Sequence, residues 1–148
     1  MLTRKGKYAL KAMAHLAGAA GGQPVRVVEI AETEKIPKKF LDGILCELRN
    51  AGFVHSKMGK GGYCLARPAG EIMIGDIVRA IDGPLAPMPC ASKTRYRRCD
   101  DCLDEDTCAV RRLMQKAQQA LSGVLDHCSL ERMRDIAETD AALQHLAH

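Results

Sequence analysis

Residues 36–65 read IPKKFLDGILCELRNAGFVHSKMGKGGYCL, and this stretch predicts a helix followed by a two-stranded ribbon. Proline is tolerated in the first turn of a helix, which is where Pro37 stands. Apolar residues then recur at intervals of three and four, so we expect one face of the helix to be buried through Phe40, Leu41, Ile44, Leu45 and Leu48. Ala51 and Gly52 end the helix.

The ribbon begins directly after this helix. Two short apolar segments, residues 53–54 and 63–65, flank a turn that is rich in glycine. Strand, glycine-rich turn and strand in this order are typical of a β-hairpin. Upstream, apolar residues within 25–35 indicate a short helix just before the one that begins at Pro37. Two helices joined by a tight turn form a helix-turn-helix, and the appended ribbon is a wing.

Further helices are expected on both sides of this unit. Residues 8–20 predict an amphipathic helix that Gly-Gly-Gln-Pro ends, and residues 74–83 predict a second, compact one. A long helix runs from about Thr107. After it, residues 129–148 predict a short helix and a poorly ordered end.

The long helix carries a heptad-like apolar stripe that a small domain cannot cover with its own chain. The simplest partner for the stripe is the same helix of a second subunit, and packing back onto its own domain is the alternative. The residues expected at this dimer interface are Val110, Leu113, Met114, Ala117, Leu121, Val124 and Leu125.

The predicted fold is therefore mainly α-helical with a small β-wing. We expect a winged helix-turn-helix domain in residues 1–83 and a cysteine-rich loop in residues 84–108. A long dimerisation helix and a C-terminal tail complete the chain in residues 109–148.

Charge is divided unevenly along the chain. Residues 1–67 carry 12 lysines and arginines against 5 acidic residues, whereas residues 68–148 carry 10 against 13. A basic half of this kind suits a polyanion, above all nucleic acid. The sequence shows no long apolar run of a signal or membrane segment, no phosphate loop and no pairing of a nucleophile with a base. We expect a cytoplasmic DNA-binding protein that is not an enzyme.

Eight residues are candidates for contacts with double-stranded DNA. In a helix-turn-helix the second helix enters the major groove with its first residues facing the base edges, while wing residues reach an adjacent groove or the phosphates. Lysine suits phosphate or guanine, and aspartate can accept from a cytosine amino group. On the second helix the candidates are Lys38, Lys39 and Asp42. Around the wing turn they are Lys57 and Lys60, and at the start of the first helix they are Lys5, Lys7 and Tyr8.

Four of the seven cysteines lie in one short segment, at Cys90, Cys99, Cys102 and Cys108. In a reducing compartment such thiols serve as metal ligands, redox groups or small packed residues rather than as a permanent disulfide framework. Iron–sulfur clusters accept varied cysteine spacings, whereas zinc ribbons present two C-x2-C pairs, and this segment has only one. We expect an iron–sulfur cluster, and the alternatives are zinc, a reversible disulfide switch or no functional role.

Three segments together resemble a known family. They are TRKGKYALKAM at residues 3–13, the helix-turn-helix segment that ends in ELRNAGFV at residue 54, and SKMGKGGYCLAR at residues 56–67. Over roughly residues 1–135 the chain is similar to the iron–sulfur winged-helix regulators of the IscR and NsrR type. The resemblance implies a homodimer that binds a partly palindromic operator, with a cluster near the base of the dimer helix that alters DNA affinity.

The resemblance also bears on the ligands of the cluster. Such regulators commonly use three cysteines and a fourth ligand, which is a histidine three residues after the last cysteine or an acidic residue near the start of the first helix. Here those places hold Arg111, which cannot ligate, and Lys7-Tyr8. The resemblance therefore implies that the extra cysteine completes an all-thiolate site for a two-iron or four-iron cluster. We expect a transcriptional repressor that senses iron, redox or nitric oxide status.

Overall fold

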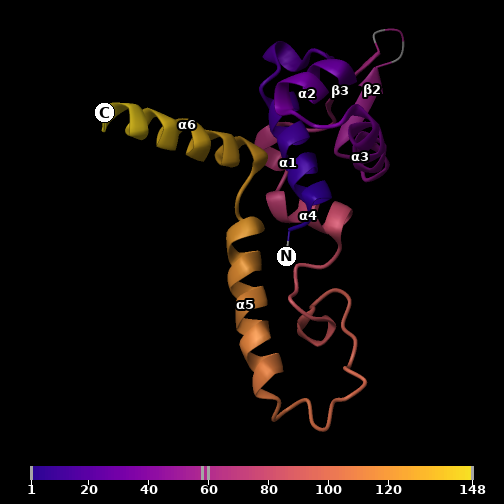
Figure 1. Ribbon diagram of the computed structural model, residues 1–148, viewed down its shortest axis with the longest axis vertical. Helices are drawn as coiled ribbons and strands as arrows, with labels where there is room; N and C mark the ends of the chain where they lie inside the picture. The colour runs from indigo at the N-terminus through magenta and orange to yellow at the C-terminus, as the bar shows by residue number, and fades with distance from the viewer. Residues whose placement is uncertain (1, 58, 60, 148) are drawn as a thin grey trace.

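The computed structural model describes residues 2–57, 59 and 61–147, and Figure 1 shows its helices and strands. A head is built from α1, α2, α3 and α4 with a small sheet, and α5 and α6 extend from it. Short 3-10 turns lie at Ala20–Gly22, Ala69–Glu71 and Pro89–Ala91. The main elements are α1 (Arg4–Ala17), β1 (Val25–Arg26), α2 (Val27–Glu34), α3 (Lys38–Asn50), β2 (Val54–Lys57), β3 (Gly62–Leu65), α4 (Ile74–Asp82), α5 (Ala109–Leu125) and α6 (Leu130–Leu146).

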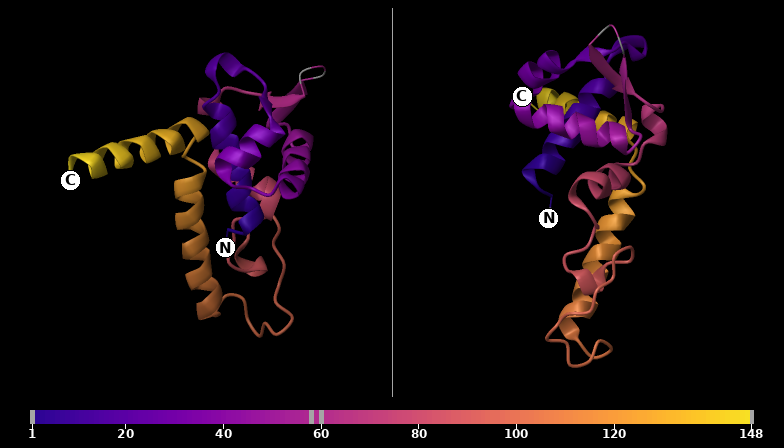
Figure 2. Two further views of the ribbon diagram at one scale, coloured as in Figure 1. Left: turned by 45° about the horizontal axis from the view of Figure 1, so that its top comes forward. Right: turned by 90° about the vertical axis from the view of Figure 1, so that its right-hand side faces the viewer.

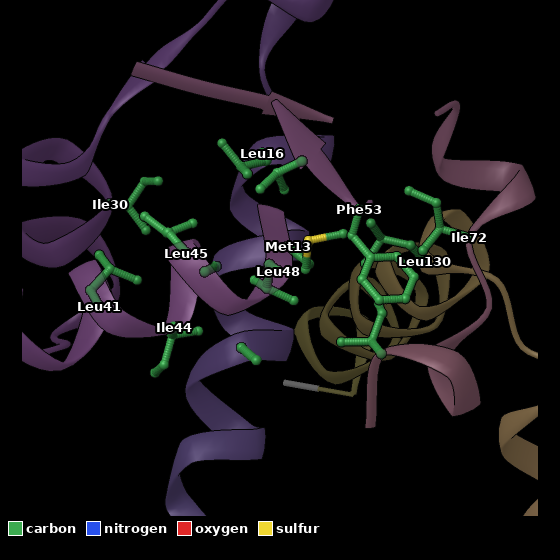
Figure 3. Packing of buried hydrophobic residues seen from close by; sticks show 14 of the residues in the cluster. Met13, Leu16, Ile30, Leu41, Ile44, Leu45, Leu48, Phe53, Ile72 and Leu130 are labelled. Atoms are coloured by element: carbon green, nitrogen blue, oxygen red, sulfur yellow. The ribbon is translucent and has the colours of Figure 1, made fainter. Parts of the chain in front are cut away.

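The core of the head lies between α1, α2 and α3. Met13 and Leu16 of α1 meet Ile30 of α2 and the apolar face of α3, as Figure 3 shows. Four of the five residues predicted to be buried on α3 are buried, and they are Leu41, Ile44, Leu45 and Leu48. The prediction for Phe40 was wrong, because its side chain is 65% exposed. Its position on the helix lies outside the arc that the other four residues share.

The predicted wing is confirmed, and it belongs to a sheet of three strands in the order β1-β3-β2. β2 and β3 pair antiparallel, with Val54 opposite Leu65. The additional strand β1 pairs with β3 through Val25 and Tyr63. Gly62 permits this pairing, because a Cβ there would lie 2.8 Å from the carbonyl oxygen of Val25. A strand of two residues is too short for an alternating pattern to reveal it in the sequence.

Helix α1 begins earlier than its apolar pattern predicted, at Arg4 rather than Tyr8. The reason is a cap, since the Thr3 hydroxyl oxygen accepts a hydrogen bond of 3.0 Å from the backbone N–H of Gly6. The first turn contains polar and small residues, so hydrophobic periodicity alone could not detect it.

Helices α5 and α6 leave the head in different directions (Figures 1 and 2). The α6 prediction was wrong in extent, because the helix runs over 17 residues rather than being short. Its first residue, Leu130, is fully buried, and its N–H donates to the carbonyl of Ile72 over 2.8 Å. The far end of α6 is exposed. Across the described residues, no helix combines the length and apolar character needed to cross a membrane.

Candidate nucleic-acid interface and cysteine loop

The start of α1, the first turn of α3 and the wing carry the predicted DNA contacts. Lys7, Lys39 and Lys57 are exposed, and Tyr8 is half-buried. The Lys5 ammonium forms an ion pair with the carboxylate of Glu47, which lies on α3. The start of α1 is thus attached to the helix that we expect in the major groove.

Two further candidates on α3 are paired with each other. The Lys38 ammonium donates to the Asp42 carboxylate over 3.0 Å, and both side chains are about half exposed. Exposed ion pairs of this kind contribute little to stability. Either side chain can therefore leave the pair and contact DNA at a small cost in free energy. Lys60 lies outside the described residues.

A hollow separates the start of α1 from the first turns of α3. Its volume is about 670 Å³. Apolar surface of Tyr8, Pro37, Phe40 and Ile44 lines it, and the cationic side chains at its edge are Arg4, Lys5 and Lys39. A polyanion with apolar groups on its surface fits such a lining.

The cysteine loop follows α4, and its first two thiols lie in contact. The Cys99 thiol donates to the Cys90 sulfur, and the two Sγ atoms are 3.7 Å apart. Cys90 is buried and Cys99 half-buried. The hydrogen bond with Cys90 raises the pKa of the Cys99 thiol, as do partial burial and the charges of Cys90, Asp101 and Cys108.

This separation suits two ligands of one metal ion. Two thiolates at about 2.3 Å from a tetrahedral metal are about 3.8 Å apart. Over the part of the chain that the structure describes, no three histidine, cysteine or acidic side chains gather tightly enough to hold a metal ion. The donor set therefore fits a thiolate-bound metal centre in chemistry and in one pair of ligands, and Cys102 and Cys108 would have to close on that pair.

Cys108 begins the long helix. It is the N-cap of α5, and its sulfur accepts from the backbone N–H of Arg111 over 3.4 Å. Cys102 is tied to the first pair through the backbone, because its N–H donates to the Cys99 carbonyl over 3.2 Å. Cys108 therefore lies at the start of α5, and the Cys90 backbone is tied to α5 through Arg111.

Arg111 organises the loop around it. Its Nε donates to the Cys90 carbonyl over 3.2 Å and its Nη1 to the Glu105 carbonyl over 3.4 Å. Its guanidinium also lies 5.9 Å from the centre of the Tyr96 ring. The sequence identified Arg111 only as a residue unable to ligate. Its structural role depends on groups 6 to 21 positions away, which no local pattern reveals.

The apolar stripe of α5 is largely uncovered in the protomer. Met114 and Leu125 are half-buried, and Ala117 is exposed. The other four residues of the stripe are between 42% and 66% exposed, and they are Val110, Leu113, Leu121 and Val124. The stripe therefore does not pack fully onto its own domain.

The fold and the site have a match among known protein families. Residues 2–136 match the family Rrf2, described as iron-dependent transcriptional regulator. The chain belongs to the Rrf2 family.

Individual relatives agree with this placement. A helix-turn-helix transcriptional regulator of Rrf2 type from Rhodobacter capsulatus is 42% identical over 137 residues, which are 90% of this chain and 91% of the relative. The solved structure of CymR, the global cysteine regulator of B. subtilis, has a TM-score of 0.73 at 32% identity and covers 90% of this chain and 94% of its own. The IscR of T. potens has a TM-score of 0.74 at 29% identity, with 95% and 90% covered.

These findings confirm the winged-helix fold and the resemblance to IscR-type regulators. Rrf2 proteins are transcriptional regulators, which agrees with the expectation of a DNA-binding protein rather than an enzyme. Arg4 and the exposed Phe40 line the hollow, but the sequence did not indicate either of them as a DNA contact. The threonine before α1 is the signal that could have revealed a helix starting at Arg4.

Proposed function

We propose that this Rrf2 regulator is a cytoplasmic homodimeric repressor whose operator affinity is controlled by an iron–sulfur cluster at Cys90, Cys99, Cys102 and Cys108. The signal is iron, redox or nitric oxide status. The observation that supports this most directly is the contact between the Cys90 and Cys99 sulfurs at the base of α5. These two thiols already have the spacing of neighbouring ligands.

The DNA contacts in this proposal come from three places in the head. Lys38, Lys39 and Asp42 face the bases and phosphates from α3, and Lys57 and Lys60 reach from the wing. From the start of α1, the phosphate backbone of the DNA is bound by Lys5, Lys7 and Tyr8. Family membership supports DNA binding, and the exposure of the described lysines supports these positions. Each phosphate contact releases counterions, so affinity should fall steeply with salt.

Dimerisation uses α5. Its stripe is exposed in the protomer, and two copies packed through it would bury apolar side chains that otherwise face water. A two-fold dimer presents two α3 helices to two half-sites about one helical turn apart. The segment 84–108 joins α4 to α5, so its shape sets the angle between α5 and each head. That angle in turn sets the separation of the two α3 helices.

When bound, a cluster would supply a group that reacts with oxidants and nitric oxide. The chain would contribute the four thiols that hold it. Arg111 shapes the loop through the carbonyls of Cys90 and Glu105. Cys108 caps the positive end of α5.

A thiol switch without metal is a second candidate, and the same contact favours it. A disulfide between Cys90 and Cys99 needs their sulfurs to close from 3.7 Å to about 2.05 Å. Zinc bound by the same thiols is the remaining alternative.

Purification without oxygen distinguishes these candidates. The absorption spectrum is recorded, and iron, sulfide and zinc are measured per protomer. Brown protein with iron and sulfide supports the cluster, and stoichiometric zinc in a colourless protein contradicts it. Colourless metal-free protein whose Cys90 and Cys99 thiols disappear on mild oxidation supports the disulfide switch.

A further inference from the structure

The position of Phe40 is unusual for a large apolar side chain. The chain has two phenylalanines, and Phe53 is buried whereas Phe40 is 65% exposed. Its neighbour Leu41 occupies the core instead. Phe40 is the third residue of α3, in the turn that a helix-turn-helix directs toward base edges. Exposing an aromatic ring to water at that place costs free energy, and a bound partner that buries the ring removes this cost.

The surroundings of Phe40 fit duplex DNA as its partner. Phe40 and Tyr8 form part of the hollow of about 670 Å³, and Arg4, Lys5 and Lys39 stand at its edge. Its one acidic residue, Glu47, is paired with Lys5. The cationic excess complements phosphates, and the apolar lining complements an uncharged group beside them.

The surface next to Phe40 is open to a flat group. Gly43 follows Phe40 by three positions on α3 and also lines the hollow. A Cβ added at Gly43 would meet nothing within 4 Å, so the described structure leaves open space beside this position. Phe40 is itself largely exposed, so a base edge can reach its ring.

The chemistry of Phe40 restricts what it can read. A phenyl ring offers no hydrogen bond to the donors and acceptors of base edges. Thymine alone presents a methyl group in the major groove, and apolar side chains contact it. We propose that Phe40 reads the 5-methyl group of a thymine in each operator half-site. This assignment rests on the proposed function, and it adds a specificity contact that the lysines cannot provide.

The test first selects an operator from random duplexes with the native protein. Each thymine is then replaced in turn by deoxyuridine, which lacks only the methyl group. Affinities are measured for the native protein and for Phe40→Ala. We expect a loss of about three- to tenfold at one or two positions per half-site with the native protein. With Phe40→Ala, removing those methyl groups should have no further effect.

Controls separate this contact from folding and from DNA binding in general. Leu143→Ala, which changes a similarly exposed residue on α6, should keep the full response to deoxyuridine. Phe40→Ala should keep the thermal transition and the salt dependence of the native protein, because it removes neither core packing nor a phosphate contact.

Three results would overturn the assignment. Native protein that binds every deoxyuridine duplex equally well does not read a methyl group. A response to deoxyuridine that persists in Phe40→Ala assigns the reading to another residue. A change of oligomeric state in Phe40→Ala, seen by sedimentation, makes this surface a protein interface. Failure to select any operator would instead count against the proposed function itself.

Discussion

Arg79 holds Asp126 through two parallel hydrogen bonds, Nη1 to Oδ1 and Nη2 to Oδ2, each 2.7 Å long. The pair ties α4 of the head to the residue that ends α5. Gly75 makes room for it, because a Cβ there would lie 1.9 Å from Oδ1 of Asp126. This contact anchors the proposed dimer helix to the DNA-binding head.

Asp126→Asn should destabilise the protein by about 1 kcal/mol at neutral pH, because it replaces a charged bidentate acceptor with a neutral amide. A loss of this size lowers Tm by about 3 °C in a chain of this length. Gly75→Ala should have a similar effect, since its methyl group displaces the carboxylate. Asp42→Asn removes an exposed pair of similar type, so its Tm should stay within about 1 °C of the native value.

The pH dependence of the Arg79–Asp126 pair gives an independent check. The hydrogen bond from Arg79 lowers the pKa of the Asp126 carboxyl. A depressed pKa in the folded state stabilises the protein fully above the unfolded value near 4, and that stabilisation is lost as pH falls through the folded value. The difference in Tm between native protein and Asp126→Asn should therefore be constant from pH 8 to pH 5 and shrink below about pH 4. A difference that grows in acid contradicts this account.

Thr3 connects the start of α1 to Asp82, the last residue of α4. Its N–H donates to Asp82 Oδ2 over 3.0 Å and its hydroxyl donates to the other carboxylate oxygen. Thr3→Ala should cost about 1 kcal/mol of stability. It should also weaken operator binding, because Lys5 and Lys7 lie in the turn that Thr3 caps.

The matched control for Thr3 is Ser129, which caps α6 through the N–H of Arg132 over 3.1 Å. Ser129→Ala should lose similar stability and keep its operator affinity. Equal operator affinities for Thr3→Ala and Ser129→Ala would show that the cap of α1 serves stability alone. Denaturant titration and fluorescence anisotropy with a labelled operator measure the two quantities.

Local patterns explain why much of the fold could be predicted. The apolar spacing around Leu41 and Leu45 and the glycines of the wing act within a few residues, so the helix-turn-helix and the ribbon are visible in sequence. The start of α1 was misjudged because its first turn, Arg4 to Lys7, has no large apolar residue. The extent of α6 was misjudged because its apolar residues are spread around the helix rather than gathered on one face. Phe40 was misassigned because periodicity does not say which edge of an apolar face meets the core.

Contacts between distant residues could not be predicted from one sequence. Arg79 and Asp126 are 47 positions apart, and Arg111 reaches Cys90 across 21. The four cysteines were visible as a set, because their spacing is local. Which two touch depends on how the loop folds against α5, so the contact between Cys90 and Cys99 required the structure.

Changing one residue of the α5 stripe should separate the proposed dimer. Val124→Asp places a charge among side chains that we expect to be buried between two copies, so sedimentation should show a monomer. Its circular dichroism should resemble that of the native protein, because Val124 is exposed in the protomer. Gln119→Asp is the control, since helical geometry places it opposite the stripe. A native protein that sediments as a monomer rejects this use of α5.

Arg111→Ala should loosen the cysteine loop by removing the two hydrogen bonds from its guanidinium. Amide hydrogens of residues 90–108 should exchange several-fold faster, while those of α3 stay protected. Arg97→Ala is the control, because the contact of Arg97 in the loop uses its backbone N–H, which donates to Pro89. Equal exchange in the native protein and Arg111→Ala would remove Arg111 from this role.

In the proposed mechanism, the state of the four loop thiols sets operator affinity. The most direct test measures the operator Kd of the native protein purified without oxygen, before and after its metal centre is removed, at one salt concentration. A coupling of useful size changes Kd at least fivefold, and a variant with serine at Cys90, Cys99, Cys102 and Cys108 should show no such change. Equal Kd values for the loaded and stripped native protein would contradict the claim and leave a DNA-binding regulator whose cysteine loop senses nothing.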